Sequence, residues 1–367
     1  MTLIKVKSRG TDNISGRRNL IINGDMKVQQ RYAVGTTTQA TNNSFVGPDR
    51  FQFFVNGGGA YTVTQDSGHQ ADTGHDKALK IAVTTADTSI AAGDFYSFLQ
   101  RIESNSLQHL QYGTSSAKSL TFSFWVRATK TGTQAVLISK QGTGTDYRRV
   151  AEYTINASDT WEHKTITIPG LTASTMANDA STYLQIGWIL KYGSTYQGTK
   201  DVWTTSGHYT TANAVNNMDS TSNVFYITGV QLEVGDSSSD FEHRSFGEEL
   251  QLCQRYYYKL SSNSSTDHMA VANGYRNTTS YFTGLVHFPV HMRISPTAME
   301  TSGTAGHFDI RNANGTLQAA SGVPAFRRGN VWGSSFTFNV ATGGTAGDGT
   351  QLRFRHEDGY LAWSAEL

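Results

Sequence analysis

The chain of 367 residues carries 30 Lys and Arg against 29 Asp and Glu, and this net charge of +1 gives no overall attraction for nucleic acid. Charged residues make up only 16% of the chain, whereas glycine is abundant at 36 residues. This composition favours β-sheets joined by turns, and the single cysteine, Cys253, excludes a disulfide framework and a thiolate zinc site.

The first 18 residues form a basic arm. Five basic side chains stand against Asp12 alone, for a net charge of +4. The arm has no apolar core like that of a secretory signal, and no run in the chain approaches the roughly 18 apolar residues of a membrane span, so we expect no membrane insertion. Two interpretations stay open, a solvated terminus or a segment that attaches to a larger assembly. The basic residues are Lys5, Lys7, Arg9, Arg17 and Arg18.

Residues 19–240 have the alternating pattern of antiparallel strands. In 119–129 an apolar residue occupies every second position, and 183–193 repeats the pattern. Further strands are expected at 160–170 and 224–235. Because no helices are interleaved, the pattern predicts one large β-sandwich. The two apolar rows are Leu120, Phe122, Phe124 and Val126, and Leu184, Ile186, Trp188 and Leu190.

A long polar stretch, 191–211, is rich in aromatic residues. Aromatic faces suit the C–H surface of a sugar ring, and loops of this length are often functional. The stretch is therefore a candidate glycan platform. The alternative is a loop that its aromatic residues fix to the sandwich or to a neighbouring subunit. The candidate residues are Tyr192, Tyr196, Trp203, His208 and Tyr209.

Residues 241–258 predict one short helix. Ser245 and Glu248 have the spacing of a capping box. Phe246, Leu250, Cys253 and Tyr257 would form one apolar stripe, able to pack on a sandwich or on symmetry mates. The helix would connect the large sandwich to a second domain.

Residues 259–367 predict a smaller β-domain. Strand candidates are 280–292, 334–342, 350–358 and 359–367. The predicted fold is thus all-β, with two antiparallel β-sandwich domains of jelly-roll type joined by one short helix.

The 11 histidines give little sign of metal chemistry. His287 and His291 would lie roughly 13 Å apart on a strand, too far to share one ion. His69 and His75 fall in a polar loop and are interpreted, like the other histidines, as ordinary surface and interface residues. No catalytic motif is present, so we expect no enzymatic activity.

Five segments together resemble a set of motifs that recurs in bacteriophage virion proteins, mostly tail fibres and structural proteins. The resemblance covers roughly residues 16–260. The first domain is also similar to jelly-roll carbohydrate-binding modules, in which an "N-L-hydrophobic-x-N-G" strand opens the sandwich and an "x-V-x-L-E" strand closes it. The segments are "GRRNLIINGDMKVQQR" (16–31), "PDRFQFF" (48–54), "LTFSFWVRAT" (120–129), "FYITGVQLEVG" (225–235) and "DFEHRSFGEELQLCQRYYYK" (240–259).

The resemblance implies a virion protein, assembled in the host cytoplasm, that contacts other tail proteins and a host surface polysaccharide. A homotrimeric fibre or spike is expected, since three weak sugar sites gain affinity when linked. Two alternatives remain. One is a structural virion protein without a receptor role, such as a head decoration, collar or tail adaptor. The other is the binding module of a bacterial enzyme.

Similarity to carbohydrate-binding modules also implies a possible structural calcium ion near the opening and closing strands. Asp25 and Glu233 occupy those positions, and calcium prefers such oxygen ligands. Capping or salt-bridge roles are the alternative for these carboxylates. No other cofactor is expected.

Overall fold

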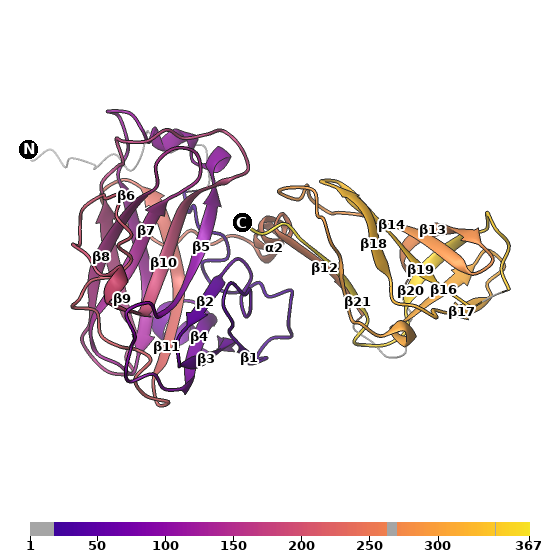
Figure 1. Ribbon diagram of the computed structural model, residues 1–367, viewed down its shortest axis with the longest axis horizontal. Helices are drawn as coiled ribbons and strands as arrows, with labels where there is room; N and C mark the ends of the chain where they lie inside the picture. Colours follow the sequence, from indigo (N-terminus) through magenta and orange to yellow (C-terminus); the bar gives the residue numbers. More distant parts are fainter. Residues whose placement is uncertain (1–17, 263–269, 342) are drawn as a thin grey trace, which may run out of the picture. The chain divides into compact units, whose positions relative to one another are not determined.

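The chain divides into two compact units, Met1–Ser245 and Phe246–Leu367 (Figure 1). The computed structural model describes residues 18–262, 270–341 and 343–367. Arg18 is therefore described, whereas the other basic residues of the predicted arm, Lys5, Lys7, Arg9 and Arg17, lie outside the described residues.

Two antiparallel sheets build the first unit. The six-stranded sheet contains, in spatial order, β1 (Thr38–Gln39), β3 (Ala60–Ser67), β4 (Lys77–Thr85), β11 (Val224–Val234), β6 (Leu120–Ala128) and β9 (Glu162–Ile168). The five-stranded sheet contains β2 (Gln52–Asn56), β5 (Phe95–Glu103), β10 (Thr182–Tyr192), β7 (Gly132–Lys140) and β8 (Tyr147–Ile155). Short helical turns lie at α1 (Gln70–Thr73) and at Ser104–Ser106, Gln108–Leu110 and Ser194–Tyr196.

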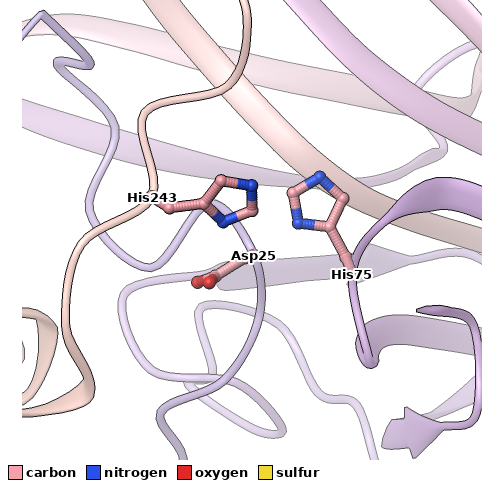
Figure 2. Close-up of side chains that lie close together, drawn as sticks. All are labelled: Asp25, His75 and His243. Atoms are coloured by element: carbon pink, nitrogen blue, oxygen red, sulfur yellow. The ribbon is translucent and has the colours of Figure 1, made fainter.

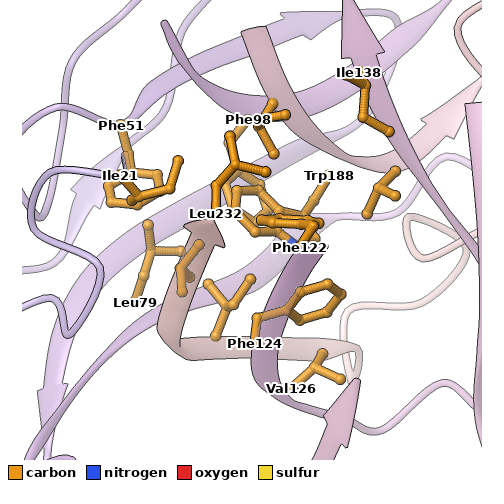
Figure 3. Packing of buried hydrophobic residues seen from close by; sticks show 14 of the residues in the cluster. Ile21, Phe51, Leu79, Phe98, Phe122, Phe124, Val126, Ile138, Trp188 and Leu232 are labelled. Carbon is orange, nitrogen blue, oxygen red and sulfur yellow. The ribbon is translucent and has the colours of Figure 1, made fainter. Parts of the chain in front are cut away.

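The core of this unit lies between the two sheets, and both predicted apolar rows face it (Figure 3). Trp188 from β10 stacks on Phe98 with ring centroids 5.0 Å apart and meets Phe122 of the opposite sheet at 5.3 Å. Burying each such side chain contributes about 1.5–3 kcal/mol relative to exposure. The prediction of strands and of their core faces at 120–126 and 184–190 is confirmed.

The single longer helix, α2, spans Phe246–Gln254 and is shorter than the predicted 241–258. Tyr257 does not continue it, because this residue begins β12 (Tyr257–Ser261) and pairs with Ser364 of β21. A run of tyrosines favours a strand where a partner strand is available. The predicted apolar stripe is wrong at its first position, since Phe246 is 58% exposed, whereas Cys253 is buried.

The second unit also consists of two antiparallel sheets around one core, which includes Trp363 and Phe338. The three-stranded sheet contains β12, β21 (Tyr360–Ser364) and β15 (Glu300–Thr301). The seven-stranded sheet contains β17 (Leu317–Ala319), β16 (Phe308–Asn312), β20 (Gly349–Phe354), β13 (Ala270–Thr278), β14 (Tyr281–His287), β19 (Gly333–Asn339) and β18 (Ala325–Asn330). A further 3₁₀ turn lies at Ala305–His307.

The predicted fold class is confirmed. The chain is almost entirely β, and its sheets are antiparallel sandwiches. In the described ranges, no helix has the length and apolar character that a membrane crossing requires.

Candidate functional site

The outer face of the five-stranded sheet carries a hollow of about 240 Å³, which we name the aromatic hollow. It is smaller than the roughly 300–1,000 Å³ typical of sites for drug-sized ligands. Six aromatic residues border it together with polar groups. The aromatic residues are Phe54, Phe95, Phe98, Tyr192, Tyr196 and Tyr209, and the polar ones are Ser97, Arg101, Gln141 and Gln185.

Strand geometry explains how these side chains reach the same face. Successive residues of a strand point to opposite sides, so Phe95, Ser97 and Arg101 of β5 face outward, whereas Phe98 enters the core. In β10 the pairing register shifts between Ile189 and Lys191. This irregularity places Tyr192 opposite Phe95 and on the outer face.

Four of these rings, those of Phe95, Tyr192, Tyr196 and Tyr209, pack against one another, and we name them the aromatic wall. Its ring centroids lie 5.2 Å apart for Tyr192–Tyr196, 5.6 Å for Tyr196–Tyr209 and 5.7 Å for Phe95–Tyr192. The Tyr196 and Tyr209 rings meet nearly edge to face, at 88°. Such contacts favour one arrangement of the rings over others.

Polar groups stand beside this wall. Gln185 Nε2 donates to Gln141 Oε1 at 2.8 Å, and each amide retains capacity for a further hydrogen bond. The Arg101 guanidinium donates to the Gln52 side chain and lies 5.8 Å from the centre of the Phe54 ring. The hollow therefore combines flat apolar faces with planar donors and acceptors.

The tyrosine at the base of the wall keeps its proton. The Tyr192 hydroxyl shares a 2.8 Å hydrogen bond with Ser97 Oγ. Burial raises the pKa of Tyr192 well above its ordinary value. At neutral pH the hydroxyl is therefore neutral and forms part of the hollow floor.

The loop that carries Tyr196 and Tyr209 is fixed to β8 by Glu152. The Glu152 carboxylate accepts hydrogen bonds from Thr211 Oγ1 at 2.6 Å and Asn213 Nδ2 at 3.2 Å, and pairs with Lys200 Nζ at 2.6 Å. Burial alone would raise the pKa of Glu152, but these three donors outweigh it and lower the pKa. The ionised carboxylate thus holds the loop against the sheet.

The five residues proposed from the sequence as a glycan platform do not all lie together. Tyr192, Tyr196 and Tyr209 line the aromatic hollow. Trp203 instead donates its indole N–H to the Pro169 carbonyl at 2.9 Å and packs against the main core. The His208 ring lies over Gly198, where an added Cβ would come within 2.1 Å of it, and it does not line the hollow.

Sequence reasoning missed the strand residues of the hollow. Phe54, Phe95, Arg101 and Gln185 come from three different strands, and Gln141 directly follows β7. One signal was available, because "YLQIGWILKY" (183–192) has apolar residues on both of its faces. Such a strand is covered on its outer side as well, as the buried Ile189 and Leu137 are here.

The two carboxylates considered for calcium have different surroundings. Asp25 pairs with Lys27 Nζ at 3.0 Å. Glu233 accepts hydrogen bonds from the Ser239 amide at 2.8 Å, from Ser239 Oγ at 2.6 Å and from Gln231 Nε2 at 2.9 Å. Glu233 therefore organises the turn after β11, whereas Asp25 belongs to a different cluster of possible metal ligands.

That cluster consists of Asp25, His75 and His243, and a second one consists of His307, His356 and Asp358. The interpretation of His69 and His75 as surface residues is wrong, since they are only 6% and 5% exposed. Burial lowers the pKa of His75 to about 4, although Asp25 acts in the opposite direction. His75 is therefore a neutral imidazole at pH 7.

The described end of the basic arm has a defined position. The Arg18 guanidinium donates to Ser239 Oγ at 2.8 Å and to the Asp240 carbonyl at 3.3 Å, and its backbone amide donates to Glu242 Oε1 at 3.1 Å. Arg18 thus contacts residues 239–242, the segment that follows β11.

Comparisons with known proteins give structural likenesses at low identity. The enzymatically active domain of bacteriophage CBA120 tailspike protein 4 matches with a TM-score of 0.30 and 11% identity, over 59% of this chain and 21% of that one. A putative sugar-binding protein from Bacteroides thetaiotaomicron has a TM-score of 0.32 and 14% identity, with 59% and 100% covered. A family 11 carbohydrate-binding module from Clostridium thermocellum, solved with a mixed-linked tetrasaccharide, has a TM-score of 0.28 and 14% identity, with 58% and 100% covered.

No family model and no curated protein matches the chain.

Proposed function

We propose that the chain binds a carbohydrate in the aromatic hollow, without catalysis, as a receptor-binding fibre or spike protein of a phage particle. The observation that supports binding most directly is the packed wall of Phe95, Tyr192, Tyr196 and Tyr209 beside the Gln141–Gln185 amide pair. Sugars combine C–H faces that stack on aromatic rings with hydroxyls that bond amides, so they match both parts of the hollow.

The size of the hollow limits what it accepts. About 240 Å³ has room for one or two sugar units and not for a long chain lying within it. We therefore propose recognition of a terminal unit or of a short segment of a host surface polysaccharide. A site of this size binds weakly alone, which fits a protein that presents several copies to a cell surface.

The chemistry of the hollow supports binding rather than hydrolysis. A glycosidase needs two carboxyl groups about 5–9.5 Å apart across the sugar bond. The residues that line the hollow include no Asp and no Glu.

The proposal that the chain belongs to a phage particle rests on the five sequence segments described above. If it is correct, the chain is located on the virion.

Substitution of the half-buried tyrosines of the wall tests the proposal. Glycan-array screening of the full chain identifies a ligand, and titration then gives its Kd. Tyr196→Ala and Tyr209→Ala should each weaken binding about tenfold, because a packed aromatic anchor in an interface typically contributes about 1–2 kcal/mol. Gln185→Ala should weaken it by removing a hydrogen-bonding amide.

Tyr275→Ala is the matched control, because Tyr275 is 49% exposed and lies in the second unit. It should leave the Kd unchanged. A chain that binds no glycan on the array would favour a structural virion protein with no receptor role. A glycan Kd that both wall substitutions leave unchanged would instead overturn the aromatic hollow as the binding site. Labelling of intact particles with an antibody against the chain would then locate it on tail, vertex or capsid.

A further inference from the structure

Three side chains from distant parts of the sequence meet in the first unit. Asp25 lies in the segment before β1, His75 lies in the turn between α1 and β4, and His243 lies between β11 and α2. One donor atom from each lies within 4.8 Å of the others. Figure 2 shows the two imidazole rings facing each other with the Asp25 carboxylate beside them.

Two buried atoms of this cluster have no hydrogen-bond partner among the described residues. They are Asp25 Oδ1 and His75 Nδ1. The His75 side chain is well buried, with 5% of the residue exposed. An unsatisfied buried polar atom costs about 1–3 kcal/mol, so native proteins nearly always provide it with a partner. An ion between the two atoms would supply that partner.

The surrounding backbone holds His75 in place. The His75 amide donates to Thr73 Oγ1 at 3.1 Å, which fixes the turn after α1. On the opposite side the imidazole abuts Gly229 of β11, where a Cβ would lie 2.6 Å from His75 Nε2. Gly229 also has a φ of +58°, at a register shift of β11. Glycine there leaves room for the ring, so Nδ1 is directed away from β11 and toward Asp25.

Asp25 is oriented by a neighbour as well. Lys27 Nζ lies 3.0 Å from Asp25 Oδ2 and donates to the Arg244 carbonyl at 2.5 Å. This pairing engages one carboxylate oxygen and leaves Oδ1 for an ion, an arrangement common around metal ligands. The ammonium group of Lys27 also repels a cation, which limits affinity. His163 is a further basic neighbour of His75.

The donor set determines the kind of ion. Two imidazole nitrogens and one carboxylate oxygen suit Zn²⁺ and related transition ions, whereas Ca²⁺ takes oxygen ligands. Bonds of about 2.0–2.1 Å place tetrahedral ligands roughly 3.3 Å apart, so donor atoms that lie within 4.8 Å of one another must approach by at most about 1.5 Å. His243 is exposed, which allows it to make this movement.

We propose that Asp25, His75 and His243 bind one divalent transition-metal ion, with Zn²⁺ as its probe. The ion links the segment before β1, the α1–β4 turn and the segment that follows β11. Its role is structural, because it fastens residues 236–245 to the sandwich. This inference does not depend on glycan binding.

Zinc titration of the full chain, stripped of metal by a chelator, tests the proposal. Calorimetry should give a Zn²⁺ site in the wild type whose affinity falls at least about tenfold in His243→Ala and in Asp25→Asn, since loss of even an outer partner costs 10–100-fold. His243 is exposed, so His243→Ala should fold normally. Thermal melting should rise with Zn²⁺ in the wild type and much less in His243→Ala.

His356→Ala is the matched control, because it removes a histidine from the second cluster and leaves the first intact. It should retain the Asp25 site. Co²⁺ provides a spectroscopic check, since its visible bands should weaken in His243→Ala only. Zinc binding that is lost in His356→Ala but unchanged in His243→Ala would overturn the proposal. Stabilisation by Ca²⁺ that depends on Asp25 but not on His243 would also overturn it.

Discussion

Glu162 shows how one carboxylate can stabilise a turn between two strands. Its Oε1 accepts hydrogen bonds from the amides of Asn156 and Ala157, at 2.8 and 3.0 Å, and its Oε2 pairs with Lys164 Nζ at 2.5 Å. Burial would raise the pKa of Glu162, but these donors outweigh it and lower the pKa to about 2. Folding therefore stabilises the ionised carboxylate of Glu162 relative to its protonated form.

This shift predicts a pH-dependent loss of stability on Glu162→Gln. The folded pKa lies below the unfolded value of about 4.3, so the contribution is complete above about pH 5 and disappears as the pH falls toward 2. We expect Glu162→Gln to cost about 1–3 kcal/mol at pH 7. The measurement is denaturant unfolding of both proteins at several pH values. A difference that stays constant down to pH 3 would contradict this role.

Two single residues show which features the sequence can predict and which it cannot. Trp188 was correctly assigned to the core because an alternating apolar row is a local pattern. The clustering of His75 with His243 could not be predicted, because the two residues are far apart in the sequence and only the fold brings them together. Its burial depends on Gly229 of a third segment, which no local pattern indicates.

At the scale of elements, the aromatic hollow depends on a loop and a strand irregularity together. The register shift in β10 places Tyr192 in the outer row, and the loop after it adds Tyr196 and Tyr209. The sequence indicated the aromatic stretch and the strand, because both are local features. The sequence did not indicate that Tyr209 lines the hollow whereas Trp203 does not, since this depends on where the loop folds back.

Glu152 fixes that loop, so Glu152→Gln should loosen it. The neutral amide loses the ion pair with Lys200 and accepts hydrogen bonds from Thr211 and Asn213 less strongly. We expect faster hydrogen exchange in residues 193–217 and glycan binding weaker by about threefold to tenfold, because the wall is less well ordered. Hydrogen exchange followed by mass spectrometry reads the first effect without any ligand.

Glu162→Gln is the matched control for this loop, since it neutralises a carboxylate of another turn. It should leave both the exchange of residues 193–217 and the glycan Kd unchanged. If Glu152→Gln left the exchange of that loop unchanged, Glu152 would not be what holds the wall. Loosened exchange with an unaltered Kd would instead argue against glycan binding in the hollow.

For the molecule as a whole, exposed apolar side chains are distributed unevenly. Among the described residues nine large apolar side chains are exposed, and seven of them lie in the smaller second unit. Surfaces of this kind often mark contacts between chains. The seven are Phe246, Tyr275, Leu285, Ile294, Leu317, Val323 and Trp332.

This distribution favours self-association through the second unit, and a homotrimer is the state we predict. Light scattering at micromolar concentration should give about 120 kDa, three times the 40.1 kDa of one chain. Leu285 and Trp332 line the same surface hollow and are 47% and 61% exposed, so Leu285→Asp with Trp332→Ala should shift the mass toward that of one chain. The control is Val202→Asp, because Val202 is 44% exposed but lies in the first unit.

Three linked copies would also bind a glycan surface far more tightly than one copy, so the dissociated variant should keep its affinity for free sugar and lose its retention on cells. A monomeric wild-type chain would contradict the prediction of a trimer. Its affinity for a glycan surface would then be that of one weak site.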